Sequence, residues 1–318
     1  MIILYDFCYW LFYWMRRMRK RYKRLPKIFY SFNEYYGLFL NRIVTPWLEK
    51  HPAKRGLNRR QRDERYTVSL TSFPARINHV HIVIEMLMRQ KFKPDHIVLW
   101  LAESQFPDKK LPDRLVDLQS RGLTVRFCDD LRSHKKYFYA FQEYPEDNII
   151  LVDDDIFLSR RMLRDLVREH KKRKKDIIST VAQPIAPSVS HLPSVWPAAR
   201  YNQKFYSTFA VQAFSGQGTL YPAHWYPQEI FQKEKAMSLA GSADDMWLQA
   251  MSYLSGVKTT MLYPHRGFPP QIFIENNVNL YQMNNNDGGN MNDQIWLALL
   301  KEYKFDELGI DEYCREIA

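Results

Sequence analysis

The sequence predicts an α/β fold for residues 66–318, with a mostly parallel central sheet flanked by helices, and a separate helical region over residues 1–65. Two observations carry this prediction. From residue 66 onward short apolar runs alternate with helical stretches, and such alternation forms βαβ units with right-handed crossovers. Residues 1–65 also hold 16 Lys and Arg against 5 Asp and Glu, which accounts for the whole net charge of +11.

The expected strands are the apolar runs, and the expected helices lie between them. We predict strands at residues 66–73, 95–103, 123–130 and 148–154. We predict helices at residues 75–90, 111–122, 134–144 and 159–175, a helix opening within 241–251, and another capped by Asn292 or Asp293 after a polar loop. Ligands of parallel sheets bind outside the carboxyl ends of the strands, so the residues that follow each strand are the first candidates for function.

Composition excludes several classes of protein. The three cysteines, Cys8, Cys128 and Cys314, are far apart and lack metal-binding or disulfide-rich spacing, which favours a reducing compartment. Residues 66–318 carry 30 basic and 30 acidic side chains. This neutral domain has no global attraction for nucleic acid, so a nucleic-acid partner is not expected.

The N-terminal region has the pattern of a membrane-surface segment. The apolar, aromatic run "MIILYDFCYWLFYWM" is followed by "RRMRKRYKR", which places seven cations in residues 16–24. The run is short against the ~20 residues of a membrane span, and its order is the reverse of a signal peptide. Interfacial aromatic residues and cations facing anionic lipid predict a monotopic anchor through residues 1–24.

Two further features of this region follow from the same pattern. The aromatic-rich residues 28–48 are expected to extend the membrane contact as a second helix, and residues 51–65 are expected to be a polar linker. The alternative is that both aromatic segments are core or oligomer helices whose cations form a solvated face. We therefore place the domain boundary at residues 65 and 66.

The stretch "NIILVDDDIFLS", residues 148–159, ends a buried strand in three acids. Residues i and i+2 of an extended chain point the same way, so Asp153 and Asp155 are expected to converge while Asp154 faces elsewhere. Two adjacent carboxylates raise each other's pKa unless a cation neutralises them. Carboxylate oxygens select Mg²⁺ or Mn²⁺, which also bind phosphate oxygens. The prediction is a divalent metal that carries a diphosphate; the alternative is a solvated turn.

An Asp-x-Asp motif that ends the fourth strand of such a domain resembles the GT-A nucleotide-sugar glycosyltransferases. The remaining motifs of that family follow in order: a glycine loop in "FSGQGTLYP" (214–222), an acidic helix start in "GSADDMWLQAM" (241–251) and a histidine in "YPHRG" (263–267). More narrowly, "SLTSFPARI", "LVDDDI" and "ADDMWL" resemble glycosyltransferases of bacterial capsule and surface-polysaccharide gene clusters.

The resemblance implies a role for each matched residue. Asp153, Asp155 and His265 would bind the metal. Asp245 would be the catalytic base and Asp244 its support, although many members have Glu-Asp at this place, and the two roles exchange if the helix begins one residue later. The donor-binding candidates are Thr71, Arg76, Glu103, Lys135, Lys136, Asp153, Asp154 and Gly216. The alternatives are a helix cap for the paired acids and an exposed helix face for the two lysines.

The function that the resemblance implies is transfer of a hexosyl or N-acetylhexosaminyl group from a nucleoside-diphosphate sugar, with UDP expected, to a glycan or lipid-linked hydroxyl. It also implies Mn²⁺ or Mg²⁺ as the cofactor, inversion at the anomeric carbon, and a peripheral location at the cytoplasmic face of a bacterial inner membrane. One rival is a haloacid-dehalogenase-type phosphatase, which has Thr where Phe157 stands here. The other is a non-catalytic membrane-associated scaffold.

Overall fold

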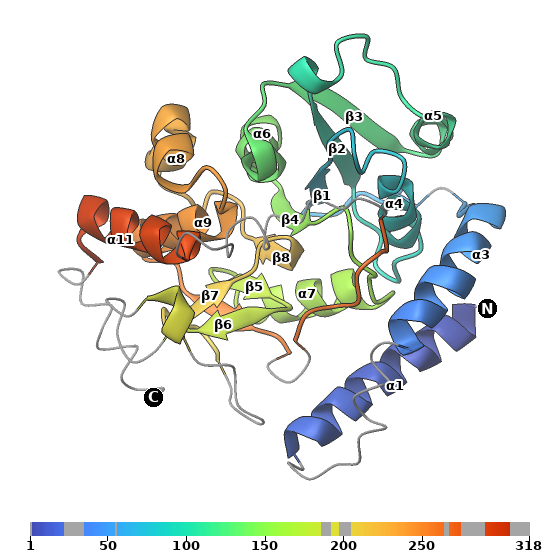
Figure 1. Ribbon diagram of the computed structural model, residues 1–318, viewed down its shortest axis with the longest axis horizontal. Helices are drawn as coiled ribbons and strands as arrows, with labels where there is room; N and C mark the ends of the chain where they lie inside the picture. The colour runs from blue at the N-terminus through green and yellow to red at the C-terminus, as the bar shows by residue number, and fades with distance from the viewer. Residues whose placement is uncertain are drawn as a thin grey trace.

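The computed structural model describes residues 2–21, 35–54, 56–185, 192–196, 205–263, 267–274 and 290–305. Figure 1 shows a central sheet with helices on both of its faces and the N-terminal helices along one side. Two buried apolar clusters, one on each face of the sheet, form most of the core.

Seven strands form the central sheet in the order β3-β2-β1-β4-β8-β5-β9. In that order they span Leu123–Cys128, His96–Ala102, Tyr66–Thr71, Asn148–Val152, Gln217–Tyr221, Ile177–Ser179 and Thr259–Met261. Strand β8 runs antiparallel to β4 and to β5, and every other pairing in the sheet is parallel. The predicted α/β class with a mostly parallel sheet is confirmed. Strands β6 (Ala182–Pro184) and β7 (Val211–Ala213) form a separate antiparallel pair.

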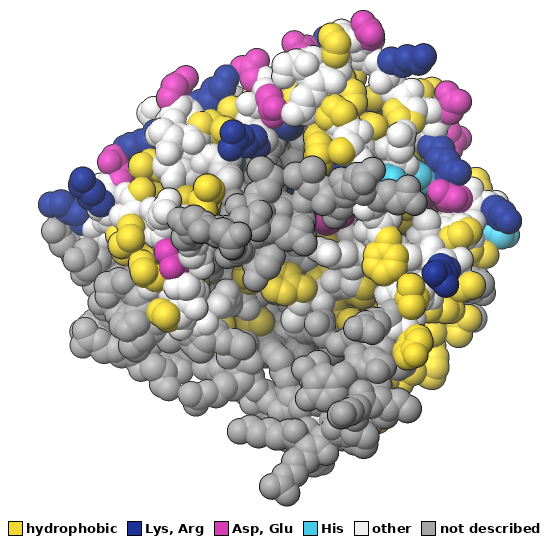
Figure 2. Space-filling model, in the orientation of Figure 1, with side chains coloured by type: hydrophobic (Ala, Val, Ile, Leu, Met, Phe, Trp, Pro, Cys, Tyr) yellow, Lys and Arg dark blue, Asp and Glu magenta, His cyan; other side chains and the backbone are white. Residues whose placement is uncertain are grey.

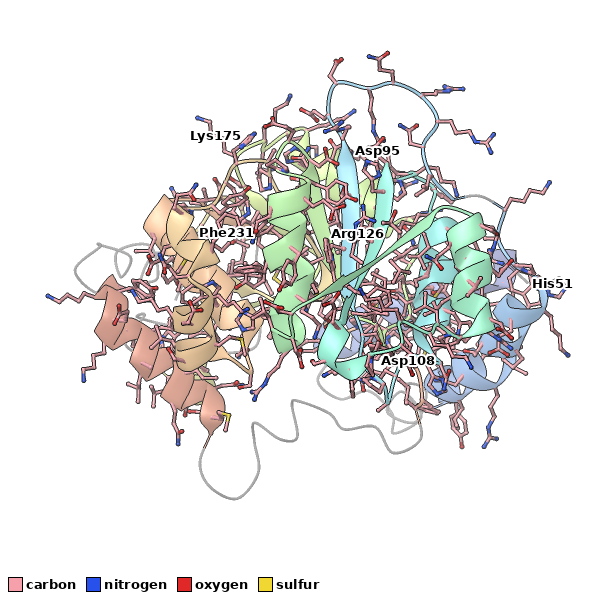
Figure 3. All side chains as sticks on the ribbon, turned by 90° about the horizontal axis from the view of Figure 1, so that it is seen from above. His51, Asp95, Asp108, Arg126, Lys175 and Phe231 are labelled. Carbon is pink, nitrogen blue, oxygen red and sulfur yellow. The ribbon has the colours of Figure 1, made fainter. Side chains whose placement is uncertain are left out.

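Helices cover the two faces of this sheet. Their bounds are α4 Val80–Met88, α5 Asp113–Ser120, α6 Lys135–Glu143, α7 Met162–His170, α8 Lys233–Ala240, α9 Asp244–Ser255 and α11 Met291–Tyr303, with short 3₁₀ turns η2 Glu103–Gln105, η3 Arg132–His134, η4 Pro193–Val195 and η5 Gln228–Phe231. Figure 3 shows the strands between the orange and red helices on one side and the blue ones on the other. Both faces of the sheet are therefore covered, as parallel strands require.

Strand β4 shows how the sequence divides between the two faces. Ile150 and Val152 belong to the cluster with α4, α5 and α7, whereas Ile149 and Leu151 belong to the cluster with α6, α9 and α11. Successive strand residues point to opposite faces. A continuous run of Ile, Leu and Val is thus buried on both sides. A slip by one residue would leave both faces apolar, so the register of β4 is set by the neighbouring strands and not by its own pattern.

Three predicted helix boundaries are wrong. Helix α4 begins at Val80 instead of residue 75, because residues 74–79 form turns in which the Arg76 and Ile77 N–H groups bond to the Phe73 carbonyl. Helix α7 is Met162–His170, shorter than 159–175. The cap of α11 is Asn290, whose side chain accepts a hydrogen bond from the Asn292 N–H at 3.1 Å.

In the N-terminal region the structure describes helices over residues 2–21 and 35–50, and residues 22–34 lie outside the described residues. Helix α1 spans Ile2–Arg21, residues 35–39 are helical, and a π-helical turn η1 (Leu40–Val44) leads into α3 (Thr45–Lys50). The buried side chains of α1 lie in the same apolar cluster as those of β1 and α4. In the described part of the chain, no helix has the length and apolar character needed to cross a membrane.

Residues 51–65 contain no described helix or strand and lie against the domain through side-chain contacts. Arg62 Nε donates to Asp95 Oδ2 at 2.9 Å, and Arg65 Nε donates to Asp147 Oδ1 at 2.7 Å. Asp95, labelled in Figure 3, lies immediately before β2. The polar segment predicted as a linker is therefore held along the sheet.

We expect the two faces of α1 to respond differently to truncation. Tyr9 is 8% exposed within the core cluster and Trp10 is 56% exposed. Tyr9→Ala removes a buried aromatic side chain and should lower the free energy of unfolding by about 3 kcal/mol. Trp10→Ala should change it by less than about 0.5 kcal/mol. Denaturant unfolding of both variants measures this, and equal small effects would contradict the packing of α1 on the domain.

Candidate functional site

The candidate site lies at the carboxyl ends of β1 and β4. Chain order reverses between these two neighbouring strands, since β2 and β3 lie on one side and β4 on the other. Such a switch point leaves a crevice in which ligands of α/β proteins bind. Ser72 follows β1 and donates from Oγ to Asp154 Oδ2 at 2.5 Å, which joins the ends of the two strands.

The three acids lie in a turn, since β4 ends at Val152. The prediction that Asp154 faces away from Asp155 is therefore wrong, while the convergence of Asp153 and Asp155 stays a prediction. Arg76 Nη1 lies 2.9 Å from both Asp154 Oδ1 and Asp155 Oδ2. Asp153 instead contacts Lys136 Nζ at 2.7 Å. The alternation of extended chain does not apply beyond the last strand residue.

Gly216 is adjacent to Asp153 because β8 pairs antiparallel with β4. The Asp153 N–H donates to the Gly216 carbonyl at 2.6 Å, and the pairing contains an irregularity between Leu151 and Val152. A Cβ at position 216 would lie 1.9 Å from the carboxyl carbon of Asp153. Only glycine fits here without moving that carboxylate.

The second acidic motif opens helix α9, as predicted. Ser215 connects it to the glycine loop, because its Oγ donates to Asp244 Oδ2 at 2.8 Å and its N–H donates to Asp245 Oδ1 at 2.7 Å. Carboxylates in a first helical turn are also favoured by the positive end of the helix dipole. The helix start thus holds both acids beside the acid turn of β4.

Lys136 joins the two acidic motifs. Its ammonium lies 2.7 Å from Asp153 Oδ1 and 3.1 Å from Asp244 Oδ2, and its side chain is almost completely buried. Burial lowers the pKa of Lys136, but the carboxylates of Asp153, Asp244 and Asp245 outweigh burial and raise it well above the usual value. Lys136 is therefore a permanent cation at the centre of the site.

The two acids of α9 differ in their electrostatic surroundings. Burial raises the pKa of Asp245, the charge of Asp244 raises it further, and the result is about 7 despite the opposing effect of Lys136. Burial would also raise the pKa of Asp244, but Lys136, His134 and hydrogen bonds lower it to about 2. Asp244 is thus a constant anion, whereas Asp245 changes protonation near neutral pH.

The acid turn carries more negative charge than its cations neutralise. Burial raises the pKa of Asp155 to about 6, and the charges of Asp153 and Asp154 oppose the lowering by Arg76. Among the residues that the structure describes, five carboxylates, at positions 153, 154, 155, 244 and 245, face two cations, Arg76 and Lys136. A further positive charge at this place would be stabilised.

The donor set fits a divalent cation with few protein ligands. The Asp153 side chain is 32% exposed, and Asp155 Oδ1 has no hydrogen-bond partner among the residues that the structure describes. Mg²⁺ is commonly bound by one or two carboxylates plus phosphate oxygens and water. No cluster of three or more His, Cys, Asp and Glu side chains arranged for a metal occurs in the described part of the chain. His265, the third predicted ligand, lies outside the described residues.

Three other predicted donor-binding residues have partners elsewhere. Lys135 is buried and its Nζ pairs with Asp130 at 2.7 Å, because consecutive helix residues point in different directions. Glu103 is exposed in η2 and pairs with Lys109 at 2.8 Å. Thr71 donates to the Trp100 carbonyl at 2.8 Å. Lys135 thus pairs with Asp130, whereas Lys136 pairs with the acids of the site, and a contact of either lysine with the diphosphate stays a prediction.

Two residues that join the site were not predicted as site residues: Ser215 and Gln217. Gln217 Nε2 donates to Asp153 Oδ2 at 3.2 Å. Ser215 and Gln217 flank Gly216 in sequence, so the glycine loop was the available signal. Nothing in their residue type distinguishes them from other polar residues.

Comparison with known proteins gives structural neighbours only. No family model matches the chain, and no curated protein sequence matches it. Mannosyltransferase PcManGT from Pyrobaculum calidifontis in complex with GDP-Man and Mn²⁺ is 12% identical with a TM-score of 0.44, over 90% of this chain and 81% of that chain. S. aureus TarS 1-349 in complex with UDP-GlcNAc is 11% identical with a TM-score of 0.45, over 78% and 71%. 4-Diphosphocytidyl-2C-methyl-D-erythritol synthase is 13% identical with a TM-score of 0.38, over 65% and 93%.

The first two neighbours are thus solved with nucleotide sugars, GDP-Man and UDP-GlcNAc. A further structure of TarS 1-349, in complex with UDP, matches over 62% of this chain and 57% of that chain.

Replacement of Lys136 should destabilise the protein more than replacement of an exposed lysine. Lys136→Met leaves the carboxylates of Asp153 and Asp244 without their cation, and loss of one partner of a buried ion pair costs about 3–5 kcal/mol. Lys109→Met removes an exposed pair with Glu103 and should cost no more than about 1 kcal/mol. Denaturant unfolding at pH 7 compares the two. Equal losses would show that Lys136 is not the cation that holds the site together.

Proposed function

We propose that the protein is a metal-dependent glycosyltransferase that moves a sugar from a nucleoside-diphosphate sugar to an acceptor hydroxyl. The observation that carries this proposal is the joining of two acidic motifs by one buried lysine, Lys136. The second of these motifs includes Asp245, whose pKa is raised to about 7. Sugar transfer needs a stabilised leaving group and a base for the hydroxyl. The two motifs supply these two functions separately.

Asp245 is the proposed general base. Its pKa of about 7 suits proton transfer at neutral pH, because the best catalytic base has a pKa close to the pH at which the enzyme works. The Ser215 N–H holds Oδ1 at 2.7 Å and leaves the second oxygen to accept the proton of the acceptor hydroxyl. Asp244 supports it, since its negative charge keeps the pKa of Asp245 raised.

Asp153 and Asp155 are the proposed protein ligands of Mn²⁺ or Mg²⁺, with His265 as the third. When bound, such an ion neutralises charge that develops on the departing diphosphate. Lys136 keeps the Asp153 carboxylate in place, and Arg76 does the same for Asp154 and Asp155. Gly216 and Asp154 shape the floor of this donor site, and Thr71 and Glu103 lie at neighbouring strand ends, where the ribose and base would bind.

The finer assignments rest on the sequence resemblance. We propose UDP as the nucleotide, a hexosyl or N-acetylhexosaminyl group as the sugar, and inversion at the anomeric carbon. We further propose a role in bacterial capsule or surface-polysaccharide synthesis, at the cytoplasmic face of the inner membrane, with residues 1–24 as the membrane-associating segment and a glycan or lipid-linked acceptor. The basic, aromatic pattern of those residues supports the location.

Replacement of Asp245 should affect sugar transfer, whereas replacement of Asp155 should affect binding of the nucleotide with its metal. Asp245→Asn should reduce transfer by about 10²–10⁴-fold, because the general base is lost, while the rise in melting temperature with UDP and Mn²⁺ persists. Asp155→Ala should abolish that rise, because a proposed metal ligand is missing. Assays over a panel of nucleotide sugars measure turnover. Equal loss of binding and turnover in Asp245→Asn would contradict its role, and absence of a shift with every nucleotide in the unaltered protein would favour the scaffold.

The pH dependence should follow Asp245. A base acts only when ionised, so kcat/KM should rise up to about pH 7 and stay level above it. Asp244→Asn removes a neighbouring negative charge, which should lower the pKa of Asp245 and move the acidic limb to lower pH. Rate profiles of both proteins, taken where each remains folded, measure the shift. An acidic limb that stays in place would show that another group controls the profile.

A further inference from the structure

Helix α1 has two faces of different character. One face is buried in the domain core and consists of Tyr5, Tyr9, Phe12 and Tyr13. The opposite face exposes four large apolar side chains: Leu4 (44%), Phe7 (54%), Trp10 (56%) and Trp14 (42%). Steps of three and four residues place these four on one stripe of the helix. We call this stripe the outer face of α1.

The aromatic members of the outer face form a continuous row. The ring centroids of Phe7 and Trp10 are 6.0 Å apart, and those of Trp10 and Trp14 are 6.2 Å apart in a stacked arrangement. Figure 2 shows hydrophobic side chains gathered at the side of the molecule where α1 and α3 lie. A contiguous exposed apolar surface marks an interaction site rather than ordinary solvent exposure.

The charge of the chain around this row identifies the partner. Seven Lys and Arg residues occupy positions 16–24, and α1 continues through Arg21, so five of these cations follow the aromatic row on the same helix. Tryptophan favours the headgroup region of a bilayer, and clustered cations favour anionic lipid. A protein partner would need a matching acidic groove, whereas a membrane of anionic lipid satisfies both features at once.

The inner face of α1 is fixed to the chain that follows the acid turn. Tyr5 donates its hydroxyl hydrogen to the Leu158 carbonyl at 2.5 Å, and Asp6 Oδ2 lies 3.0 Å from Arg160 Nη1. Leu158 is three residues beyond Asp155. A surface that binds α1 therefore determines the orientation of the candidate site as well.

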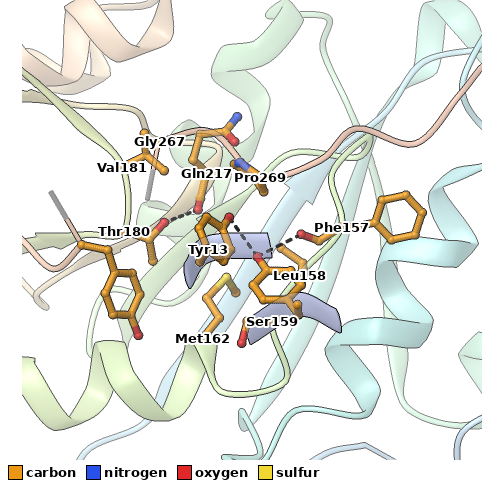
Figure 4. A pocket seen from close by; sticks show the side chains of 12 residues that line it. Tyr13, Phe157, Leu158, Ser159, Met162, Thr180, Val181, Gln217, Gly267 and Pro269 are labelled. Atoms are coloured by element: carbon orange, nitrogen blue, oxygen red, sulfur yellow. Dashed lines mark hydrogen bonds between the residues drawn. The ribbon is translucent and has the colours of Figure 1, made fainter. Parts of the chain in front are cut away.

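A small cavity lies between α1 and that site (Figure 4). Tyr9 and Tyr13 of α1 form part of its wall, with Leu158, Met162, Val181 and Gln217 among the other lining residues. Gln217 is the residue whose amide donates to Asp153. The cavity is thus lined both by α1 and by a residue that contacts the carboxylate proposed to bind the metal.

We propose that the outer face of α1 binds flat on an anionic membrane, and that the site takes its acceptor from that membrane as an amphiphile with a sugar headgroup. The second half of this proposal rests on the glycosyltransferase function proposed above. The rigid attachment of α1 holds the Asp153 site next to the bilayer surface, where the headgroup of such an acceptor lies.

Vesicle binding tests the docking face. Sedimentation with vesicles of phosphatidylcholine and phosphatidylglycerol (3:1) should capture the full chain, and pure phosphatidylcholine should capture it at least tenfold less. The triple variant Phe7→Gln, Trp10→Gln, Trp14→Gln should lose at least tenfold in binding to the anionic vesicles. The matched control Val116→Gln, Val195→Gln, Leu297→Gln removes equally exposed apolar side chains from other surfaces and should bind normally. Undiminished vesicle binding of the triple variant would overturn the docking face. So would a different result for the unaltered protein: no binding to vesicles, together with a dimer seen by light scattering that the triple variant no longer forms.

The acceptor class is tested with one sugar headgroup in two forms. Dodecyl glycosides carried in the anionic vesicles should be glycosylated at least tenfold more efficiently than the matching methyl glycosides, and the triple variant should lose this preference. Hydrolysis of the nucleotide sugar in solution should be equal in all three proteins, because none of the changes touches the site. Hydrolysis of the donor without a preference for dodecyl over methyl glycosides would overturn the acceptor class alone. Absence of hydrolysis with every donor would count against the proposed function itself.

Discussion

The ion pairs of Lys136 are the interaction on which the site depends. Asp153 follows strand β4 and Asp244 opens helix α9, and the two residues are 91 positions apart in the sequence. Their carboxylates repel each other in a buried setting, where like charges cost the most free energy. One ammonium between them converts this repulsion into attraction. The placement of Asp245, the glycine loop and the acid turn follows from that contact.

The cations of the site bind carboxylates in this structure, although the sequence suggested that they would bind phosphate. Arg76 is shared by Asp154 and Asp155, and Lys136 by Asp153 and Asp244. Within the described part of the chain, five acids face these two cations, and such an excess of negative charge suits a divalent metal far better than an unaccompanied diphosphate. The proposed donor would therefore bind with its metal, and the two basic residues would act by holding the metal ligands in position.

The N-terminal helix combines two properties that are usually found in separate segments. Its inner face is part of the core, through Tyr5 and Tyr9, and its outer face has the composition of a membrane-surface helix, through Trp10 and Trp14. A flexible anchor would leave the domain free to tumble above the bilayer. A helix packed on the chain beside the acid turn transmits its own orientation to the site, so the proposed membrane binding would also determine access of the proposed acceptor.

Local pattern in the sequence determined the first four strands, most helix positions and the acidic motifs, because apolar periodicity and strand-end acids depend only on neighbouring residues. Four strands and the opening of α9 were predictable for this reason. Only the tertiary structure decided that Lys136 enters the site while Lys135 pairs with Asp130, that Ser215 holds both acids of α9, and that Tyr5 and Trp10 lie on opposite sides of one helix with different partners. Each of these outcomes depends on a contact between segments far apart in the chain, and no residue's own type or immediate neighbours specify which distant segment it will meet.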